Sequence, residues 1–339
     1  MITKGTRVLV TGACGSIGSN MVEKLLLSGC VVCAFDQNED GLFHLDQRFR
    51  ARYGEHLKLF VGSVRDQDRL DRALEGVEIV FHCAALKHVY LSEYNPFETM
   101  LTNIHGVNNI INSSLKANVK HVIFTSSDKA VNPSSTMGAT KLLGERLITA
   151  ANHHSGDHFT KFSSVRFGNV LNTNGSVLHI FRKQLKQGMP LTITSKKMTR
   201  FFITMEQAVD LCIYAANNMI GGEVFVMNMG SCSIINLAKV ISQEKPFKYT
   251  IIGEKPGEKL YEELVTDVEA PRTVLKDNIY TIIPETLNMM RPSIEQEYSN
   301  TYKNAVRLSS SLRSDNELLT ESEIFSYLKS NKIINESYD

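Results

Sequence analysis

The segment VLVTGACGSIGSN (residues 8–20) constrains the fold more than any other, because three glycines separate an apolar run from a helical pattern. Gly12, Gly15 and Gly18 have the spacing GxxGxxG. Glycines there permit a tight turn and close approach of the backbone to a pyrophosphate at the helix N-terminus. Asp36 ends the next apolar run, 18 residues after Gly18, near the spacing at which an acid binds a ribose diol. The segment predicts a dinucleotide site; the alternative is a glycine turn without a ligand.

The residues around this turn also indicate which dinucleotide binds. Gln37 and Asn38 follow Asp36, so no adjacent arginine is available for a 2′-phosphate. We therefore expect NAD rather than NADP. The residues assigned to the cofactor in and after the turn are Gly12, Gly15, Ser16, Ile17, Gly18 and Asp36.

Apolar runs and helical patterns alternate through the first half of the chain. The expected strands cover residues 7–12, 31–36, 57–63, 77–85, 121–127 and 162–170. The expected helices cover residues 20–29, 67–74, 95–117 and 137–152. Continuous apolar strands separated by helices imply a parallel sheet covered on both faces, which is the doubly wound (Rossmann) α/β fold.

The periodicity becomes less regular after residue 175. We expect an NAD-binding domain over residues 1–175, with a later return of the chain, and a smaller mixed α/β substrate lobe over residues 176–285. Residues 286–339 form a polar extension with a packing or oligomer role. Within it, Thr320 and Glu323 are spaced as a helix capping box.

Composition excludes several classes of protein. A net charge of +1 gives no bulk attraction to nucleic acid or to an anionic membrane. There is no apolar run of membrane-spanning length and no signal-peptide pattern, so we expect a cytoplasmic protein. Cys30 and Cys33 form a CxxC within a strand pattern, where side chains three apart point to opposite faces, so we expect buried thiols. His82, expected at a strand end, and His88 have no partner at metal-ligand spacing, and we expect no metal.

Several further stretches resemble one family. They are AALKHV (84–89), NPFE (95–98), SDKAVNP (127–133), MGATK (137–141), VRFGNVL (165–171), MTRFFIT (198–204) and PGEKLYEEL (256–264). Together with the glycine turn they resemble the UDP-N-acetylglucosamine 4,6-dehydratases of the extended short-chain dehydrogenase superfamily. The chain departs from the family pattern at Ser63, at Tyr90 and over residues 170–177.

The resemblance implies a reaction that removes water across C5 and C6 of a hexosamine and leaves a 4-keto-6-deoxy sugar. NAD takes a hydride from C4 and returns it to C6, so it stays bound between turnovers. The resemblance implies Asp128 as the acid for the C6 hydroxyl, Lys129 as the base at C5, and Ser127 as a hydrogen-bonding partner of the C4 oxygen. The base for the C4 hydroxyl stays open between Asp128 and Lys141 acting through a water.

Met137 stands where the superfamily has a catalytic tyrosine, four residues before Lys141. Four residues make one helical turn, so both side chains share a face. The resemblance implies that Lys141 binds the nicotinamide ribose, and some 4,6-dehydratases also carry this methionine. We therefore expect proton transfer to rely on residues 127–129.

The resemblance also suggests contacts outside this segment. Lys87 and His88 are expected near the cofactor and sugar, with a surface lysine as the alternative. Asn169 and Arg200 resemble positions that contact a diphosphate, for which the forked donors of arginine are suited. Glu258 and Lys259 are expected at the substrate nucleotide or in a loop without chemistry. The remaining cofactor contacts are assigned to Ser63, Val64, Ala84, Ala85 and Asn103.

Alternatives remain at this point. The nucleotide is UDP or GDP, and the stereochemistry at C5 is open. The chain could be a 4-epimerase or ketoreductase of the same superfamily, although Met137 argues against enzymes that use the tyrosine. It could also be a non-catalytic NAD-binding sensor. Relatives associate through the helices of residues 95–117 and 137–152, so a homo-oligomer is expected by analogy.

Overall fold

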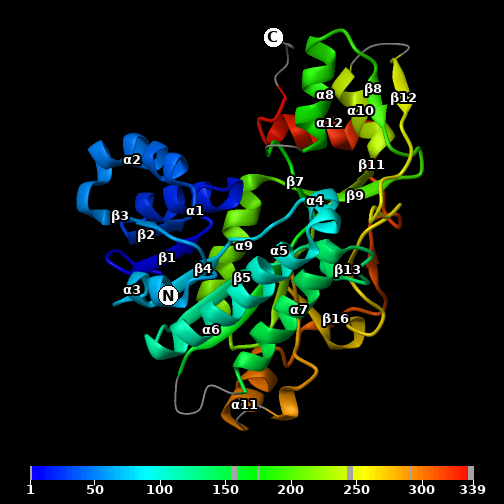
Figure 1. Ribbon diagram of the computed structural model, residues 1–339. Coiled ribbons are helices and arrows are strands. Elements are labelled where there is room, and N and C mark those ends of the chain that lie inside the picture. Colours follow the sequence, from blue (N-terminus) through cyan, green and yellow to red (C-terminus); the bar gives the residue numbers. More distant parts are fainter. Residues whose placement is uncertain (1, 154–158, 174–175, 243–246, 290–291, 335–339) are drawn as a thin grey trace.

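The computed structural model, which describes residues 2–153, 159–173, 176–242, 247–289 and 292–334, contains a ten-stranded central sheet (Figure 1). From edge to edge its strands are β16 (Val306–Arg307), β14 (Thr273–Lys276), β15 (Ile279–Ile282), β10 (Val224–Met227), β6 (Lys161–Arg166), β5 (His121–Thr125), β4 (Ile79–His82), β1 (Arg7–Thr11), β2 (Val31–Asp36) and β3 (Leu57–Val61).

The strand directions confirm the doubly wound fold. The strands from β3 to β10 are all parallel, in the order 3-2-1-4-5-6 and then 10. The remaining edge differs from the expected parallel pattern, because β15, β14 and β16 are antiparallel to their neighbours. β14 and β15 are joined by Asp277 and Asn278, both at positive φ, and such a tight turn can only join antiparallel strands.

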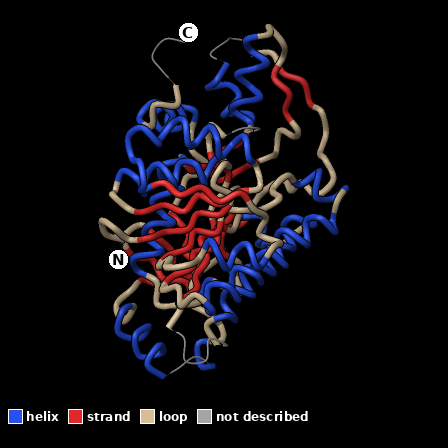
Figure 2. The backbone as a smooth tube through the Cα atoms, turned by 60° about the vertical axis from the view of Figure 1, so that its left-hand side comes forward, coloured by secondary structure: helices blue, strands red, loops and turns tan. Residues whose placement is uncertain are grey.

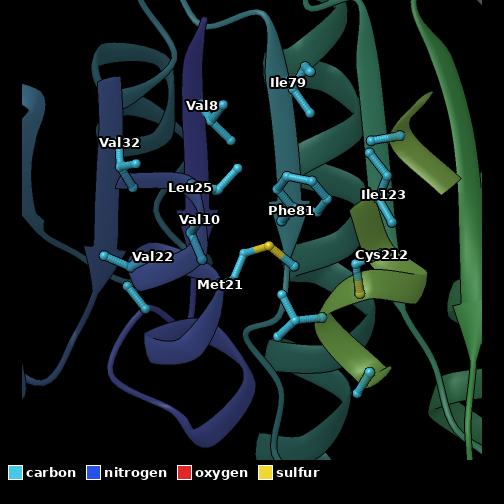
Figure 3. Packing of buried hydrophobic residues seen from close by; sticks show 14 of the residues in the cluster. Val8, Val10, Met21, Val22, Leu25, Val32, Ile79, Phe81, Ile123 and Cys212 are labelled. Atoms are coloured by element: carbon cyan, nitrogen blue, oxygen red, sulfur yellow. The ribbon is translucent and has the colours of Figure 1, made fainter. Parts of the chain in front are cut away.

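Helices cover both faces of the sheet, which separates it from solvent (Figure 2). α1 (Ser16–Leu27), α2 (Glu39–Tyr53) and α9 (Met205–Asn218) pack on one face. Figure 3 shows this core, in which Met21 of α1 and Cys212 of α9 meet Val10 and Phe81 of the strands. α3 (Gln67–Ala73), α6 (Gly106–Lys116) and α7 (Thr136–Ala151) pack on the other. Such double burial explains why the strands are continuously apolar.

The CxxC prediction is confirmed by this arrangement. Cys30 packs in the core under α1 and Cys33 in the core under α6, so the two thiols face opposite sides of β2. All six cysteines, each within the described chain, are free.

Two predicted helices differ in their bounds. The first begins at Ser16 rather than residue 20, because the backbone turns into the helix directly at Gly15. The pattern of residues 95–117 divides into α5 (Pro96–Met100), a π-helical turn at Leu101–His105 and α6. The π turn carries Asn103, whose amide exchanges hydrogen bonds of 2.8 and 2.9 Å with the backbone of Leu86.

A smaller lobe lies beyond the carboxyl ends of the parallel strands, at the top of Figure 1. It contains α8 (Val177–Lys186), α10 (Ile234–Ser242), α12 (Glu321–Ser330) and the parallel pair β8 (Leu191–Ile193) and β12 (Tyr249–Ile251). β7 (Asn169–Val170), β9 (Thr199–Ile203) and β11 (Ser231–Ser233) form a sheet between this lobe and the main body, and β13 (Glu263–Val265) pairs with β17 (Leu312–Arg313). This smaller mixed lobe confirms the expected architecture. The predicted boundary after residue 175 lies outside the described residues.

The polar C-terminal region contributes to both parts of the molecule. α11 (Pro292–Thr301) lies at the opposite end from the lobe, where the Tyr298 hydroxyl donates to the carbonyl of Gly221 at 2.9 Å. α12 returns to the lobe, where Ile324 and Leu328 complete its apolar core. The predicted capping box is confirmed, because Thr320 and Glu323 each accept the other's backbone N–H. No helix of the described chain is both long and apolar enough to cross a membrane.

The other short elements are α4 (Val89–Tyr94) and the 3₁₀ turns Gly54–His56, Asp128–Ala130, Ala270–Arg272 and Leu287–Met289.

Candidate active site

A cavity of about 550 Å³ opens at the carboxyl ends of β1, β4, β5 and β6. Ligands of open α/β sheets bind at this edge. Most of the predicted cofactor residues are in its wall: Gly12, Gly15, Ser16, Ile17, Gly18, Asp36, Ser63, Val64, Ala84, Ala85, Lys87 and Lys141. Asn103 is not in the wall; it is buried and holds the Leu86 backbone beside the cavity.

The glycine turn is shaped by close backbone approaches. Gly12 has a φ of +66°, and a Cβ there would lie 2.7 Å from the amide nitrogen of Ala84. A Cβ on Gly18 would lie 2.0 Å from the Gly12 carbonyl oxygen. Side chains are therefore excluded, and the N-terminus of α1 faces the cavity with free backbone donors. The turn thus provides a cradle that suits a pyrophosphate.

Asp36 is fixed at the end of β2. Its carboxylate accepts hydrogen bonds of 2.9 Å from the backbone N–H of Cys14 and of Asn38. A carboxylate accepts about four hydrogen bonds, so lone pairs remain for the hydroxyls of a ribose. The cradle and this oriented acid together fit a dinucleotide.

Residues 127–129 place an acid and an amine side by side at the end of β5. Ser127 caps the 3₁₀ turn Asp128–Ala130, and its hydroxyl donates to Asp128 Oδ1 at 2.9 Å. Lys129 Nζ donates to the same oxygen at 2.9 Å. Ser127 and Lys129 are in the cavity wall, whereas Asp128 lies behind them and is fully buried. Among the described residues, its second oxygen, Oδ2, has no hydrogen-bond partner.

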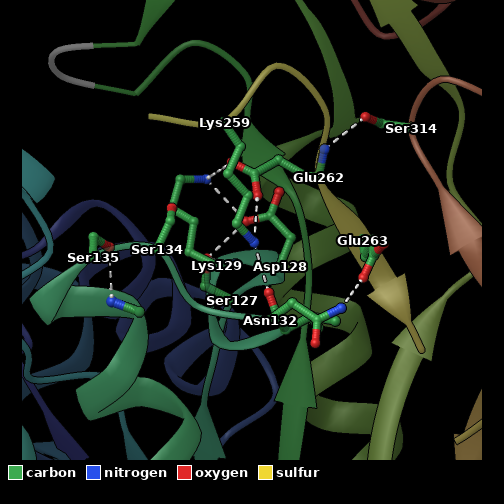
Figure 4. A network of polar contacts seen from close by, with 12 residues as sticks. Ser127, Asp128, Lys129, Asn132, Ser134, Ser135, Lys259, Glu262, Glu263 and Ser314 are labelled. Carbon is green, nitrogen blue, oxygen red and sulfur yellow. Dashed lines mark hydrogen bonds and ion pairs between the residues drawn. The ribbon is translucent and has the colours of Figure 1, made fainter. Parts of the chain in front are cut away.

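Glu262 joins this pair from the segment before β13 (Figure 4). Its Oε1 lies 3.6 Å from Lys129 Nζ and 3.8 Å from Arg200 Nε, and its Oε2 lies 3.8 Å from Lys259 Nζ. Burial raises the pKa of Glu262, although the neighbouring cations oppose that shift. Burial also opposes the charge on Lys129, but Asp128 and Glu262 outweigh it and raise the pKa of this lysine. The site therefore favours Lys129 as an ammonium group.

Met137 and Lys141 lie on α7, which packs directly against the 3₁₀ turn Asp128–Ala130, and both are in the cavity wall. Lys141 Nζ donates to the carbonyl of Thr125 at 2.8 Å and lies 4.6 Å from the centre of the Phe124 ring. Burial lowers the pKa of Lys141 to about 8, against the opposing effect of Cys83 and Glu145. An appreciable fraction of this amine is neutral near physiological pH.

The structure separates the predicted substrate residues into two sets. Lys87, His88 and Asn169 line the cavity. Arg200, Glu258 and Lys259 are not among its wall residues. Arg200 donates to the carbonyls of Thr199 and Lys259 at 2.7 and 2.9 Å, and Lys259 donates to the carbonyl of Val131 at 2.7 Å.

The Glu258 carboxylate accepts from the backbone N–H of Lys255, within the loop itself. Lys259 and Glu262 are therefore the residues of the motif PGEKLYEE that lie at the edge of the site, whereas Glu258 bonds within its own loop.

The comparison with known families is consistent with this geometry. The sequence profile described as polysaccharide biosynthesis protein matches residues 8–284. The chain belongs to this family. A relative from Methanocaldococcus jannaschii named an uncharacterized membrane protein is 44% identical over 291 residues, which cover 83% of this chain and 86% of that protein. The inverting UDP-N-acetylglucosamine 4,6-dehydratase of Campylobacter jejuni is 38% identical over 283 residues, 83% of each chain.

Another member of the wider group, from Rickettsia conorii, is named UDP-glucose 4-epimerase and is 36% identical over 269 residues, 77% of this chain and 78% of that protein. Among solved structures, Pen from Bacillus thuringiensis superposes with a TM-score of 0.89 and 36% identity, covering 98% of this chain and 100% of that one. The predicted resemblance to the 4,6-dehydratases is therefore confirmed.

The sequence analysis did not predict Glu262 as a residue of the site. The signal was its place in the stretch PGEKLYEEL, but two adjacent glutamates gave no indication of which one faces the site. Glu263 points away and accepts a hydrogen bond from the side-chain amide of Asn132 (Figure 4). Ser126, Thr125 and Thr102 also line the cavity without having been predicted.

Proposed function

We propose that this protein is an NAD-dependent nucleotide-sugar 4,6-dehydratase, a lyase that converts an NDP-N-acetylglucosamine (UDP or GDP) to the 4-keto-6-deoxy sugar. One observation carries the proposal: the buried Asp128 is bonded to Lys129 in the wall of the cavity that the glycine turn lines, beside Lys141, and Met137 stands where the superfamily has a tyrosine. The named activity of the Campylobacter jejuni relative supports this assignment.

The cofactor's place follows from the cradle. The backbone of residues 12–18 would hold the pyrophosphate, Asp36 the adenosine ribose, and Lys141 the nicotinamide ribose. When bound, NAD supplies a hydride acceptor at C4 of the sugar and a hydride donor for C6. The chain's own side chains hold the sugar and move the protons.

The Asp128–Lys129 pair can supply both an acid and a base from a single proton. With Lys129 as ammonium and Asp128 as carboxylate, neither group is in the state that elimination needs. Transfer of one proton along their 2.9 Å contact makes Lys129 a free amine for C5–H and Asp128 an acid for the C6 hydroxyl.

The C4 hydroxyl needs a second base, and we assign it to Lys141 acting through a water. Lys141 lines the cavity, and Asp128 is already assigned as the acid for the C6 hydroxyl. The Lys141 pKa of about 8 leaves a usable fraction of free amine at neutral pH. We assign the hydrogen bond to the C4 oxygen to Ser127, which is also in the cavity wall.

The test is direct incubation of the purified protein with UDP- and GDP-N-acetylglucosamine, followed by mass spectrometry. We expect loss of one water without net consumption of added NAD. An unchanged mass with altered sugar stereochemistry would instead indicate an epimerase, as the name of the Rickettsia conorii relative suggests. An unchanged substrate with bound NAD would indicate a sensor.

The Asp128→Asn variant separates these outcomes further. A dehydratase should lose at least about 100-fold in turnover while still binding NAD, because it loses its general acid. Equal dehydration by wild type and variant would exclude the assignment of Asp128.

We also propose that the enzyme is a cytoplasmic homo-oligomer. Phe97, Met100 and Leu143 on α5 and α7 expose apolar side chains on the helices expected to associate. Light scattering after size-exclusion chromatography should give a mass of at least two chains, and a monomer at micromolar concentration would refute the proposal.

A further inference from the structure

Glu262 is the hub of a buried charge cluster at the edge of the cavity. Its carboxylate lies within 4 Å of three cationic groups, which come from three separate parts of the chain. These are Lys129 of the 3₁₀ turn after β5, Arg200 of β9 and Lys259 of the loop before β13. We propose that Glu262 is a positioning residue for the dehydration, whose carboxylate fixes the Lys129 amine at the cavity wall. This inference rests on the function proposed above.

The backbone aims Glu262 at Lys129. Its N–H donates to the hydroxyl of Ser314 at 2.9 Å, and its carbonyl accepts from the backbone N–H of Ser314 at 2.9 Å. Ser314 is fully buried and its hydroxyl also contacts that of Thr199 at 2.8 Å. The peptide at Glu262 is therefore clamped from both sides, and its side chain has little freedom to leave the cluster.

The charge count in the cluster gives Glu262 a chemical consequence. Lys129, Arg200 and Lys259 face two carboxylates, Asp128 and Glu262. Without Glu262, three cations would share one carboxylate inside the protein, and only Asp128 would offset the repulsion that Arg200 exerts on Lys129. Glu262 therefore keeps the shared proton of the Asp128–Lys129 pair within the site.

Glu262 also has unused hydrogen-bonding capacity. It is 2% exposed, and within the described part of the chain its Oε2 has no hydrogen-bond partner. A carboxylate with a purely structural role is normally bonded at both oxygens, because an unbonded buried polar atom costs about 1–3 kcal/mol. At 3.6–3.8 Å the carboxylate holds the three cationic groups by charge, and its free oxygen is not used by a structural hydrogen bond.

The proposal predicts a specific change in the pH dependence of kcat/KM. The reacting pair needs the proton it shares, so activity falls when pH rises through the pKa of Lys129. Glu262 raises that pKa, as does Asp128, while burial and Arg200 lower it. The alkaline limb of the profile, where kcat/KM falls with rising pH, should therefore move to lower pH by about one unit in Glu262→Gln. A merely structural contact would not move this limb.

Two further variants serve as controls. Glu262→Asp keeps the charge, and its alkaline limb should stay within a few tenths of a pH unit of the wild-type position even where turnover falls. Glu263→Gln alters the neighbouring glutamate, which bonds Asn132 outside the cluster, and should leave both limb and turnover unchanged.

A readout independent of activity completes the test. Acetylation of Lys129, followed by mass spectrometry as a function of pH, reports the pKa of its amine in the NAD-loaded protein. This pKa of the Lys129 amine should be lower in Glu262→Gln than in the wild type and unchanged in Glu263→Gln. Equal alkaline limbs and equal acetylation profiles in wild type and Glu262→Gln would overturn the proposal. Absence of dehydration by the wild-type protein would overturn the proposed function instead, and the acetylation profiles would still decide whether Glu262 controls Lys129.

Discussion

Two buried charge clusters lie close together in this molecule and differ in how completely they are bonded. Arg166 of β6 is 1% exposed and forms paired hydrogen bonds of 2.7–3.1 Å with both Glu145 and Glu269, and it also donates to the carbonyl of Leu264. In the Lys129 cluster the two carboxylates are also buried, but the side chains of Lys129 and Lys259 are 25% and 19% exposed. Asp128 Oδ2 and Glu262 Oε2 lack hydrogen-bond partners in the described chain.

The completeness of hydrogen bonding distinguishes a charge cluster that stabilises the fold from one that is available for a reaction. In the Arg166 cluster every guanidinium nitrogen is bonded, so the charges have one arrangement, which ties α7 and the loop after β13 to the sheet. In the Lys129 cluster two carboxylate oxygens of the described chain remain unbonded. Incomplete bonding next to a cavity is a cost to stability that a reaction can use.

The largest expected effect comes from breaking the satisfied cluster. Arg166→Met would leave Glu145 and Glu269 buried without a cation. We expect the free energy of unfolding to fall by about 3–5 kcal/mol, since breaking a buried pair leaves uncompensated charge. Chemical denaturation measures it. A change below about 1 kcal/mol would remove the distinction drawn between the two clusters.

At Asp128 we expect the opposite of Arg166, namely a large effect on turnover and a small effect on stability. Besides the loss of turnover expected above, Asp128→Asn should change the free energy of unfolding by less than about 1 kcal/mol. It removes a buried and incompletely bonded charge, and the Lys129 side chain that it leaves is 25% exposed, so its charge still reaches water. The same denaturation experiment applies, with Arg166→Met as the matched comparison. A loss as large as that of Arg166→Met would make Asp128 a structural residue.

The third prediction uses the opposite pKa directions of two glutamates. Burial opposes ionisation of Glu269, but Arg166 outweighs it and lowers its pKa to about 2, so its contribution is present above pH 4.5 and lost as pH falls toward 2. The pKa of Glu262 is raised, so its protonation favours the fold as pH falls from neutrality to 4.5.

In Glu269→Gln the free energy of unfolding should therefore fall less as the pH drops below 4.5. In Glu262→Gln it should fall more than in the wild type as the pH drops from neutrality to 4.5. Thermal unfolding across pH measures both. Parallel curves for wild type and the two variants would contradict the assigned directions.

The smallest effect is expected at Ser127. Ser127→Ala removes the hydroxyl that bonds Asp128 Oδ1 and that we place at the C4 oxygen. We expect turnover to fall about tenfold, with a change in stability of about 0.5–1.5 kcal/mol. Steady-state kinetics measures the first, and unchanged turnover would exclude a contact with the sugar.

The elements that the sequence predicted well are those encoded by local pattern. The glycine turn requires particular residues at fixed offsets because a Cβ on Gly18 would overlap the Gly12 carbonyl. Apolar runs located the first six strands of the sheet for a similar reason, since strands buried on both faces are mostly apolar, although β6 also buries Ser163, Ser164 and Arg166.

Elements that depend on distant partners could not be predicted. Arg200 resembled a diphosphate ligand, but whether its donors are free depends on the carbonyls of residues 259 and 260, which tertiary structure brings to it. The choice between Glu262 and Glu263 depends on the pairing of β13 with β17, some fifty residues later in the chain. The roles assigned to Asp128, Lys129 and Lys141 stay predictions.

The return of the chain to the lobe in α12 has a consequence for biosynthesis. Ile324 and Leu328 complete a core whose other members, such as Leu178 and Leu237, leave the ribosome long before them. The strands up to β6 can assemble during translation, but α8 and α10 must wait with apolar faces open to water. We expect ribosome-bound chains that stop before residue 320 to be cleaved by protease in α8 and α10 while the strand region resists. Equal resistance of both regions would refute this order of assembly, in which the smaller lobe is the last part of the molecule to form.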